Sequence, residues 1–136
     1  MRRKIRVVGA MIEKDGKYLI TQRPATASLP LLWEFPGGRV EDAETDEEAL
    51  RREVKERLGV DVVVGKEVRR VVHPYATYTV ELHVYEGSLA SERLQALRVN
   101  DFRWVLPSEL DQFRFPGADQ HTVDQLLGLA PPQPKE

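Results

Sequence analysis

β-Branched and other apolar side chains dominate residues 4–13 over polar ones, which is typical of a β-strand. They include Ile5, Val7, Val8 and Ile12. Asp15 and Gly16 follow as a two-residue hairpin signal, and apolar and polar positions alternate at residues 17–23. The pattern therefore predicts a β-hairpin over residues 4–23.

The apolar spacing changes to that of a helix after residue 44. One apolar stripe recurs at i, i+4 and i+8 and consists of Leu50, Val54 and Leu58. Thr45 and Glu48 have the spacing of a capping box, and Gly59 is placed to end the helix. These signals predict an amphipathic helix between Thr45 and Gly59.

Apolar clusters, glycines and prolines indicate the structure of the other segments, which lie at residues 24–38 and 60–110. Prolines and small residues predict a loop at 24–32, and a short apolar segment at 33–38 ends in Pro-Gly-Gly. Further strands are predicted at 60–72, 77–85 and 101–106, with a turn at 73–76 and a helical turn at 107–110. Residues 88–100 fit a loop and a short helix equally well.

A second amphipathic helix is predicted at 118–129, with Val123, Leu126 and Leu127 facing inward. The order of strands, helix, strands and helix predicts an α+β fold. We expect an α/β/α sandwich in which a mixed β-sheet lies between helices. Residues 1–130 are expected to form one domain, and residues 131–136 a proline-rich tail.

The composition is that of an ordinary globular protein. The chain has 136 residues, 41% of them hydrophobic and 31% charged, and a net charge of -2. This small net charge gives no sign of binding to a nucleic-acid polymer or a membrane surface through bulk electrostatics. The chain has no cysteine, which excludes disulfides, thiolate metal sites and cysteine nucleophiles.

The first residues place basic side chains before apolar ones, as a signal peptide does. Charged residues at 13–15 end the apolar run too early for such a peptide. No segment approaches the roughly 20 apolar residues of a membrane span. We therefore expect a complete cytoplasmic protein, either a monomer or a homodimer.

Acidic and basic residues alternate densely in "GGRVEDAETDEEALRREVKERLGV", residues 37–60. Glu53, Glu56 and Arg57 are related by i, i+3 and i+4, so they share one face of the helix. Such a helix is most often a solvated surface with i,i+4 ion pairs. Carboxylates beside a glycine-rich loop are also ligands that Mg²⁺ prefers, and Mg²⁺ bridges phosphate oxygens. Residue types alone leave both interpretations open and favour the first.

The order of these residues resembles the signature of the Nudix hydrolases, Gly-x5-Glu-x7-Arg-Glu-U-x-Glu-Glu-x-Gly-U, where U is a bulky aliphatic residue. The matching residues are Gly38, Glu44, Arg52, Glu53, Val54, Glu56, Gly59 and Val60. Arg57 stands where the family has its last glutamate. The segments "ITQRP", "LPLLWEFPGG", "FRWV" and "FPGAD" also resemble the mutator-type branch, which acts on 8-oxo-dGTP or CTP. The resemblance covers roughly residues 5–127.

The resemblance implies a nucleotide pyrophosphohydrolase with this sandwich fold. Glu53, Glu56 and the backbone carbonyl of Gly37 would bind Mg²⁺ or Mn²⁺. Arg52 would orient the glutamates, and Glu44 would support that ion-pair network. A metal-activated water would attack a nucleoside triphosphate and release a monophosphate and pyrophosphate.

Three flanking residues are candidates for substrate binding. Phe35 can stack on the base or belong to the core, and Arg23 can reach the substrate or be a surface charge. Asp119 stands where relatives that act on 8-oxo-guanine have an asparagine. An ionised Asp119 accepts hydrogen bonds and would suit the amino group of cytosine, or it only caps a helix.

Two arginines depart from the family pattern. Arg57 replaces one glutamate, and Arg98 occupies the position of another that many relatives have before the tryptophan matched by Trp104. An arginine cannot bind a metal ion but is well shaped to bind phosphate. The domain would then work with fewer metal ions, use carboxylates such as Glu92, Asp101 or Glu48 instead, or have become a binding or interaction module without hydrolysis. The three histidines show no metal-ligand spacing and are expected to be structural.

Overall fold

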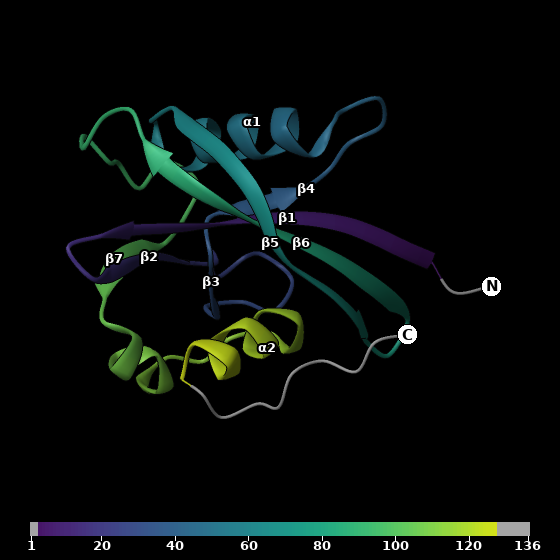
Figure 1. The fold of residues 1–136 in the computed structure, drawn as a ribbon. Coiled ribbons are helices and arrows are strands. Elements are labelled where there is room, and N and C mark those ends of the chain that lie inside the picture. Colours follow the sequence, from purple (N-terminus) through teal and green to yellow (C-terminus); the bar gives the residue numbers. More distant parts are fainter. Residues whose placement is uncertain (1–2, 128–136) are drawn as a thin grey trace.

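A computed structural model describes residues 3–127, which form a seven-stranded sheet with helices on both faces (Figure 1). The strands are β1 (Arg3–Lys14), β2 (Lys17–Gln22), β3 (Trp33–Glu34), β4 (Gly37–Arg39), β5 (Val62–Pro74), β6 (Tyr78–Leu89) and β7 (Asp101–Val105). The helices are α1 (Asp46–Leu58), the 3-10 helix η1 (Pro107–Gln112) and α2 (Gly117–Leu126).

The long strand β1 organises the sheet. It pairs antiparallel with β2 and β4 and parallel with β6, while β5 pairs antiparallel with β6. The short strand β3 and strand β7 both pair antiparallel with β2. The parallel β1–β6 pair among antiparallel neighbours makes the sheet mixed, as the sequence predicted.

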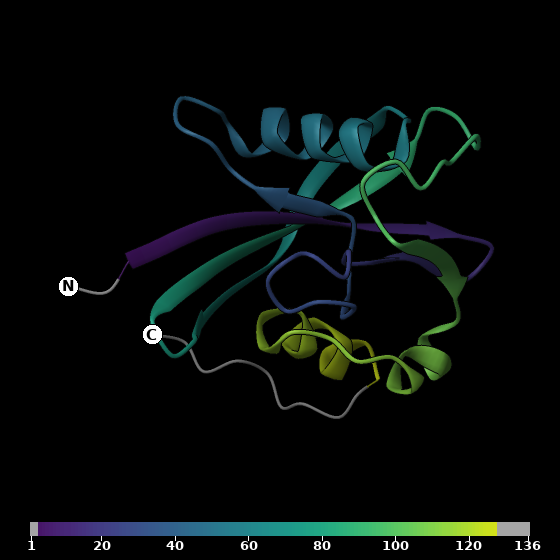
Figure 2. The same ribbon diagram turned by 180° about the vertical axis from the view of Figure 1, so that it is seen from behind.

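Helix α1 covers one face of the sheet, and α2 with η1 covers the other (Figures 1 and 2). The predicted stripe of α1 has no exposed surface and packs against β1 and β5. On the other face, Val123 of α2 is fully buried beside Trp33 and Phe115, and Leu126 and Leu127 pack at the edge of that cluster. The α/β/α sandwich is confirmed.

The element boundaries differ from the prediction in a few places. Strand β5 extends two residues further than expected, to Pro74, and residues 90–100 contain no helix. Helix α2 starts at Gly117, and residues 128–129 of the predicted helix lie outside the described part, as does the tail 131–136. No helix within residues 3–127 is long and apolar enough to cross a membrane.

The start of α1 is tied to the sheet through Asp46. Its carboxylate accepts hydrogen bonds from Arg6 Nε and Nη2 of β1, at 2.7 and 2.8 Å, and from the Tyr85 hydroxyl of β6. The hydrogen bonds from Arg6 hold the pKa of Asp46 below its usual value. The position in the first helical turn also favours a negative charge.

We expect this contact to make stability depend on acid pH. Because the pKa of Asp46 is depressed in the fold, its contribution is present above the ordinary carboxyl pKa and is lost as pH falls through the lower folded value. Asp46→Asn should lower the free energy of unfolding by about 1–2 kcal/mol at pH 7. Urea unfolding from pH 7 to pH 3 measures this, and a difference between parent and variant that does not shrink toward pH 3 would contradict it.

Candidate functional site

Helix α1 directs four charged side chains, at residues 52, 53, 56 and 57, toward strands β3 and β4. Thr45 and Glu48 cap its start reciprocally, with Thr45 Oγ1 accepting from Glu48 N–H and Glu48 Oε1 accepting from Thr45 N–H. Gly59 ends it in the left-handed conformation with φ 73°. Because the opposite stripe is buried, the rotation of α1 is fixed and residues 52, 53, 56 and 57 lie on the side toward β3 and β4.

The double glycine of β4 lies directly beneath this face, as Figure 2 shows for β4 and α1. A Cβ atom on Gly38 would lie 1.4 Å from Glu53 Oε2, and one on Gly37 would lie 2.0 Å from the carbonyl oxygen of Val8. Glycine is therefore required at Gly37, where the backbone of Val8 and Gly9 would clash, whereas a methyl group at Gly38 would displace the flexible end of Glu53. The contact brings the Glu53 carboxylate onto the backbone that also carries the Gly37 carbonyl.

Arg52 gathers the glutamates into one network. Its Nε and Nη2 donate to Glu44 at 2.7 and 2.9 Å, and its Nη1 donates to Glu53 at 3.0 Å and Glu56 at 3.4 Å. Nη2 also donates to the backbone oxygen of Arg39 at 3.0 Å. The hydrogen bond from Arg52 lowers the pKa of Glu44 to about 2. The structure thus brings together the four residues expected to form the catalytic group.

Arg57 joins this group to a buried carboxylate in β3. Its Nη2 donates to Glu53 Oε2 and its Nη1 to Glu34 Oε2, both at 3.2 Å. Arg23 donates to the other Glu34 oxygen at 3.1 Å and is itself held by Ser28. Burial raises the pKa of Glu34, although both arginines oppose the shift.

Arg98 approaches the same group from the loop before β7. Its Nη1 lies 3.6 Å from Glu56 Oε2, and its side chain is largely exposed. The carboxylates considered as substitutes for missing ligands are engaged elsewhere. Glu48 caps α1, Glu92 pairs with Lys14, and Asp101 accepts from the N–H of Phe102 and from Arg103.

Two neighbouring hollows lie beside these residues. The first, of about 340 Å³, is lined by Arg23, Pro24, Ala27, Glu53, Glu56, Arg57 and Arg98. The second, of about 440 Å³, contains Glu34 and the tyrosines Tyr75 and Tyr78, whose rings stack at 5.2 Å. Arg23 and Arg57 line both hollows, so the two hollows adjoin.

Asp119 lies in the first turn of α2 and contacts β3. Its carboxyl group accepts a hydrogen bond from the backbone N–H of Phe35, so the residue does more than cap its own helix. Burial, followed by the negative charge of Glu34, raises the pKa of Asp119 to about 8. This shift favours the protonated form of the carboxyl group near neutral pH. A protonated carboxyl group both donates and accepts, whereas the ionised group expected from the sequence only accepts.

Phe35 belongs to the core. Only 3% of its surface is exposed, and its ring stacks on Phe115 with centroids 5.9 Å apart. This placement favours the packing role over stacking on a base. The aromatic surface of the second hollow comes from Tyr75 and Tyr78, which had no motif to mark them.

The described residues contain no group of three or more His, Asp or Glu side chains that could hold a metal ion alone. Both oxygens of Glu53 already accept hydrogen bonds from arginines. Glu53, Glu56 and the Gly37 carbonyl are nevertheless hard oxygen donors, and Mg²⁺ is usually bound by one or two carboxylates together with substrate phosphates. The residues therefore fit Mg²⁺ that is shared with a phosphate ligand.

Comparison with known proteins gives matches over nearly the whole chain. The family model of the NUDIX domain matches residues 7–125. The CTP pyrophosphohydrolase of Escherichia coli (strain K12) is 36% identical over 140 residues, which cover 97% of this chain and 98% of that protein. The 8-oxo-dGTP diphosphatase of Proteus vulgaris is 36% identical over 77 residues, 57% of this chain and 69% of that protein.

The fold also matches solved structures. The crystal structure of a MutT NUDIX hydrolase from Burkholderia pseudomallei superposes with a TM-score of 0.80 at 26% identity, covering 91% of this chain and 98% of that one. Sequence and fold thus point to the same group of proteins.

Proposed function

This chain belongs to the NUDIX domain family, and on that premise we propose that it hydrolyses a cytidine-like nucleoside triphosphate to the monophosphate and pyrophosphate. The family match and the named relatives make it an enzyme that cleaves nucleotide pyrophosphate bonds and confirm the resemblance to the mutator-type branch. The particular substrate and the roles of individual residues are our proposal, as are a cytoplasmic place of action and a monomeric or dimeric state.

One observation carries the proposal. Glu53 and Glu56 share a hollow with three arginines, and two of these, Arg23 and Arg57, also line the hollow that contains the tyrosines. A triphosphate in the first hollow would place its base in the second. Arginines bind phosphate oxygens through paired N–H donors, and within residues 3–127 Arg57 directs one N–H donor to Glu34 and another to Glu53.

Nudix enzymes generally use divalent metals such as Mg²⁺. We propose that Glu53, Glu56 and the Gly37 carbonyl hold this ion. When bound, it lowers the pKa of a water and neutralises charge that develops on phosphorus. Arg52 orients both carboxylates, since it contacts each of them and is anchored by Glu44. Arg23, Arg57 and Arg98 position the phosphates.

Asp119 lies beside Glu34, which lines the second hollow, and a protonated Asp119 would offer a donor and an acceptor side by side to a base bound there. Its O–H can donate to N3 of cytosine while its carbonyl oxygen accepts from the N4 amino group. The relative named CTP pyrophosphohydrolase, which matches over nearly the whole chain, supports a cytidine nucleotide over an oxidised purine.

A second candidate function is a nucleotide-binding module without hydrolysis. The observation that favours it is the pairing of both Glu53 oxygens with arginines, which competes with metal binding. The deciding experiment incubates the protein with CTP, dCTP and 8-oxo-dGTP in Mg²⁺ or Mn²⁺ and measures pyrophosphate. Release with CTP or dCTP above the rate with 8-oxo-dGTP supports our proposal, whereas tight binding without release under either metal supports the module.

Asp119 is expected to make pyrimidine recognition pH-dependent. Because its pKa is about 8 and the protonated form is the donor, kcat/KM for CTP should fall as pH rises through about 8. Asp119→Asn cannot titrate and should show no fall in that range, and Asp119→Ala should lose about tenfold at pH 7. Steady-state kinetics from pH 6 to pH 9.5 measure this. Equal rates for Asp119→Ala and the parent would remove Asp119 from recognition.

Gly38→Ala is expected to lower pyrophosphate release by about 100-fold while the fold survives. The added methyl group would occupy the place of the Glu53 carboxylate, whose flexible end has to move away. Circular dichroism checks the fold, and Gly9→Ala, whose added Cβ would meet its nearest atoms at an ordinary 3.8 Å, serves as the control for a glycine replacement. An active Gly38→Ala enzyme would mean that the position of Glu53 is not critical.

A further inference from the structure

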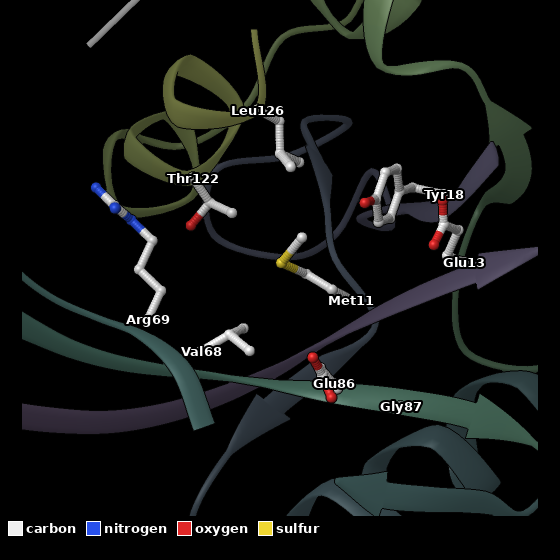
Figure 3. A pocket seen from close by; sticks show the side chains of 9 residues that line it. All are labelled: Met11, Glu13, Tyr18, Val68, Arg69, Glu86, Gly87, Thr122 and Leu126. Carbon is white, nitrogen blue, oxygen red and sulfur yellow. The ribbon is translucent and has the colours of Figure 1, made fainter. Parts of the chain in front are cut away.

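A third hollow lies on the α2 side of the sheet, away from the nucleotide site. It encloses about 590 Å³, within the range of small-molecule pockets. Its walls are Met11, Glu13, Tyr18, Val68, Arg69, Glu86, Gly87, Thr122 and Leu126, shown in Figure 3. It shares no lining residue with the two hollows around Arg57, so the nucleotide site does not account for it.

The strand registers bring two carboxylates to one face of the sheet. Glu86 of β6 is directly opposite Met11 of β1, and Glu13 of β1 is directly opposite Tyr18 of β2. Side chains two residues apart on a strand point the same way, so Met11 and Glu13 share this face. Both glutamates are exposed to solvent and line the same hollow.

A buried hydroxyl faces these strands from α2. Thr122 is only 1% exposed, and its Oγ1 has no hydrogen-bond partner among residues 3–127. Figure 3 shows this hydroxyl directed from α2 toward the strands. A buried hydroxyl without a partner is unfavourable, so a ligand that accepts its hydrogen bond would recover that energy.

The remaining walls are mostly apolar, apart from the Arg69 side chain, which lies at the end of the hollow beside Thr122 (Figure 3). Met11 lies in the middle of the hollow, with Leu126 above it from α2 and Val68 beside it from β5 (Figure 3). The ring of Tyr18 adds an aromatic face next to Glu13, and such faces attract cations.

From this arrangement we propose that the hollow is a second binding site, which takes a small amphipathic amine. The ammonium group lies near Glu13 and Glu86, the apolar body covers Met11, and an acceptor on the ligand receives the hydrogen bond of Thr122. This site is independent of the nucleotide pocket and of the activity proposed above.

The chain provides its own reporter for this site. Met11 and Met1 are its two methionines, so methyl-labelled methionine gives two NMR signals, one of them inside the hollow. The probes are hexylammonium, hexanol and hexanoate, which share one apolar body and differ in charge. Hexylammonium should shift the Met11 methyl signal saturably and bind at least tenfold more tightly than the other two.

Variants test each wall. Glu13→Gln and Glu86→Gln should each weaken hexylammonium about threefold, and together about tenfold, whereas Glu47→Gln on the far side of α1 should have no effect. Thr122→Val keeps the shape and removes the hydroxyl. It should weaken 6-aminohexanamide about fivefold and leave hexylammonium unchanged. Equal shifts from all three six-carbon probes, no saturable shift, or no effect of the double glutamine variant would overturn the proposal.

Discussion

Glu53→Gln is expected to lower pyrophosphate release from CTP by about 10³-fold with little change in fold. Glutamine has the shape of glutamate but lacks the charge that we assign to Mg²⁺ binding and to orientation of the phosphate site. The replaced side chain is 7% exposed and lies against Gly38, so water cannot easily take its place. Arg52 keeps Glu44, and Arg57 keeps Glu34, so neither arginine loses all its partners.

The measurement is kcat with saturating CTP and Mg²⁺, with circular dichroism as a check of folding. Glu47→Gln is the matched control, because Glu47 lies on the same helix with an exposed side chain and is outside the proposed site. A Glu53→Gln enzyme within threefold of the parent would show that hydrolysis, if present, does not depend on this carboxylate.

The parts of the site that follow from local spacing were predictable from the sequence. Glu53, Glu56 and Arg57 share a face because a helix of 3.6 residues per turn brings i, i+3 and i+4 together, and Arg52 is one turn before Glu56. The helix itself was predictable because its capping box and its left-handed glycine are local signals. The mixed sheet followed in outline from alternation and turn residues.

The parts that depend on strand pairing were not predictable in this way. Glu34 meets Arg57 only because β3 and β4 carry the chain beneath α1, and nothing in the sequence around Glu34 sets it apart. Tyr75 and Tyr78 face the same hollow through the turn between β5 and β6. A single sequence does not contain the registers that create these contacts.

The histidines show the same limit. His73 and His121 were expected to be unrelated structural residues, yet their ring nitrogens lie 3.2 Å apart where β5 meets α2. His83 is 1% exposed and lies between Glu67 and Glu81. The structural role expected for it agrees with this burial, but its partners come from register rather than from neighbouring sequence.

Arg57 gains a more specific role from these contacts. It is a cation held between a carboxylate of the proposed metal site, Glu53, and a carboxylate of the proposed base pocket, Glu34. A fixed guanidinium in this position supplies positive charge without a metal ion. We therefore expect the enzyme to need fewer divalent ions than a relative that has glutamate at this position.

Arg57→Glu is expected to raise the turnover of CTP about tenfold in saturating Mg²⁺ and to tighten the binding of Mn²⁺ by a similar factor. The change removes a cation beside Glu53 and adds a hard oxygen ligand to the same face of α1. Without metal, the variant should melt at a lower temperature than the parent. The new carboxylate then lies close to those of Glu34 and Glu53, and no arginine at position 57 offsets their repulsion. Added Mg²⁺ should restore part of that loss, since a ligand that binds the folded state stabilises it.

Arg57→Gln separates charge from ligation, because it removes the cation without adding a carboxylate. Its Mn²⁺ affinity, measured by electron paramagnetic resonance, should lie between those of the parent and Arg57→Glu. If Arg57→Glu binds no more Mn²⁺ than the parent and turns over more slowly, then the phosphate contact of Arg57 matters more than the metal ligand gained there, and Arg57 does not stand in for a metal ion. The same measurement gives the number of Mn²⁺ ions bound per chain. That number shows whether Arg57 replaces a metal ion or only contacts the phosphates, even where the turnover of both variants is low.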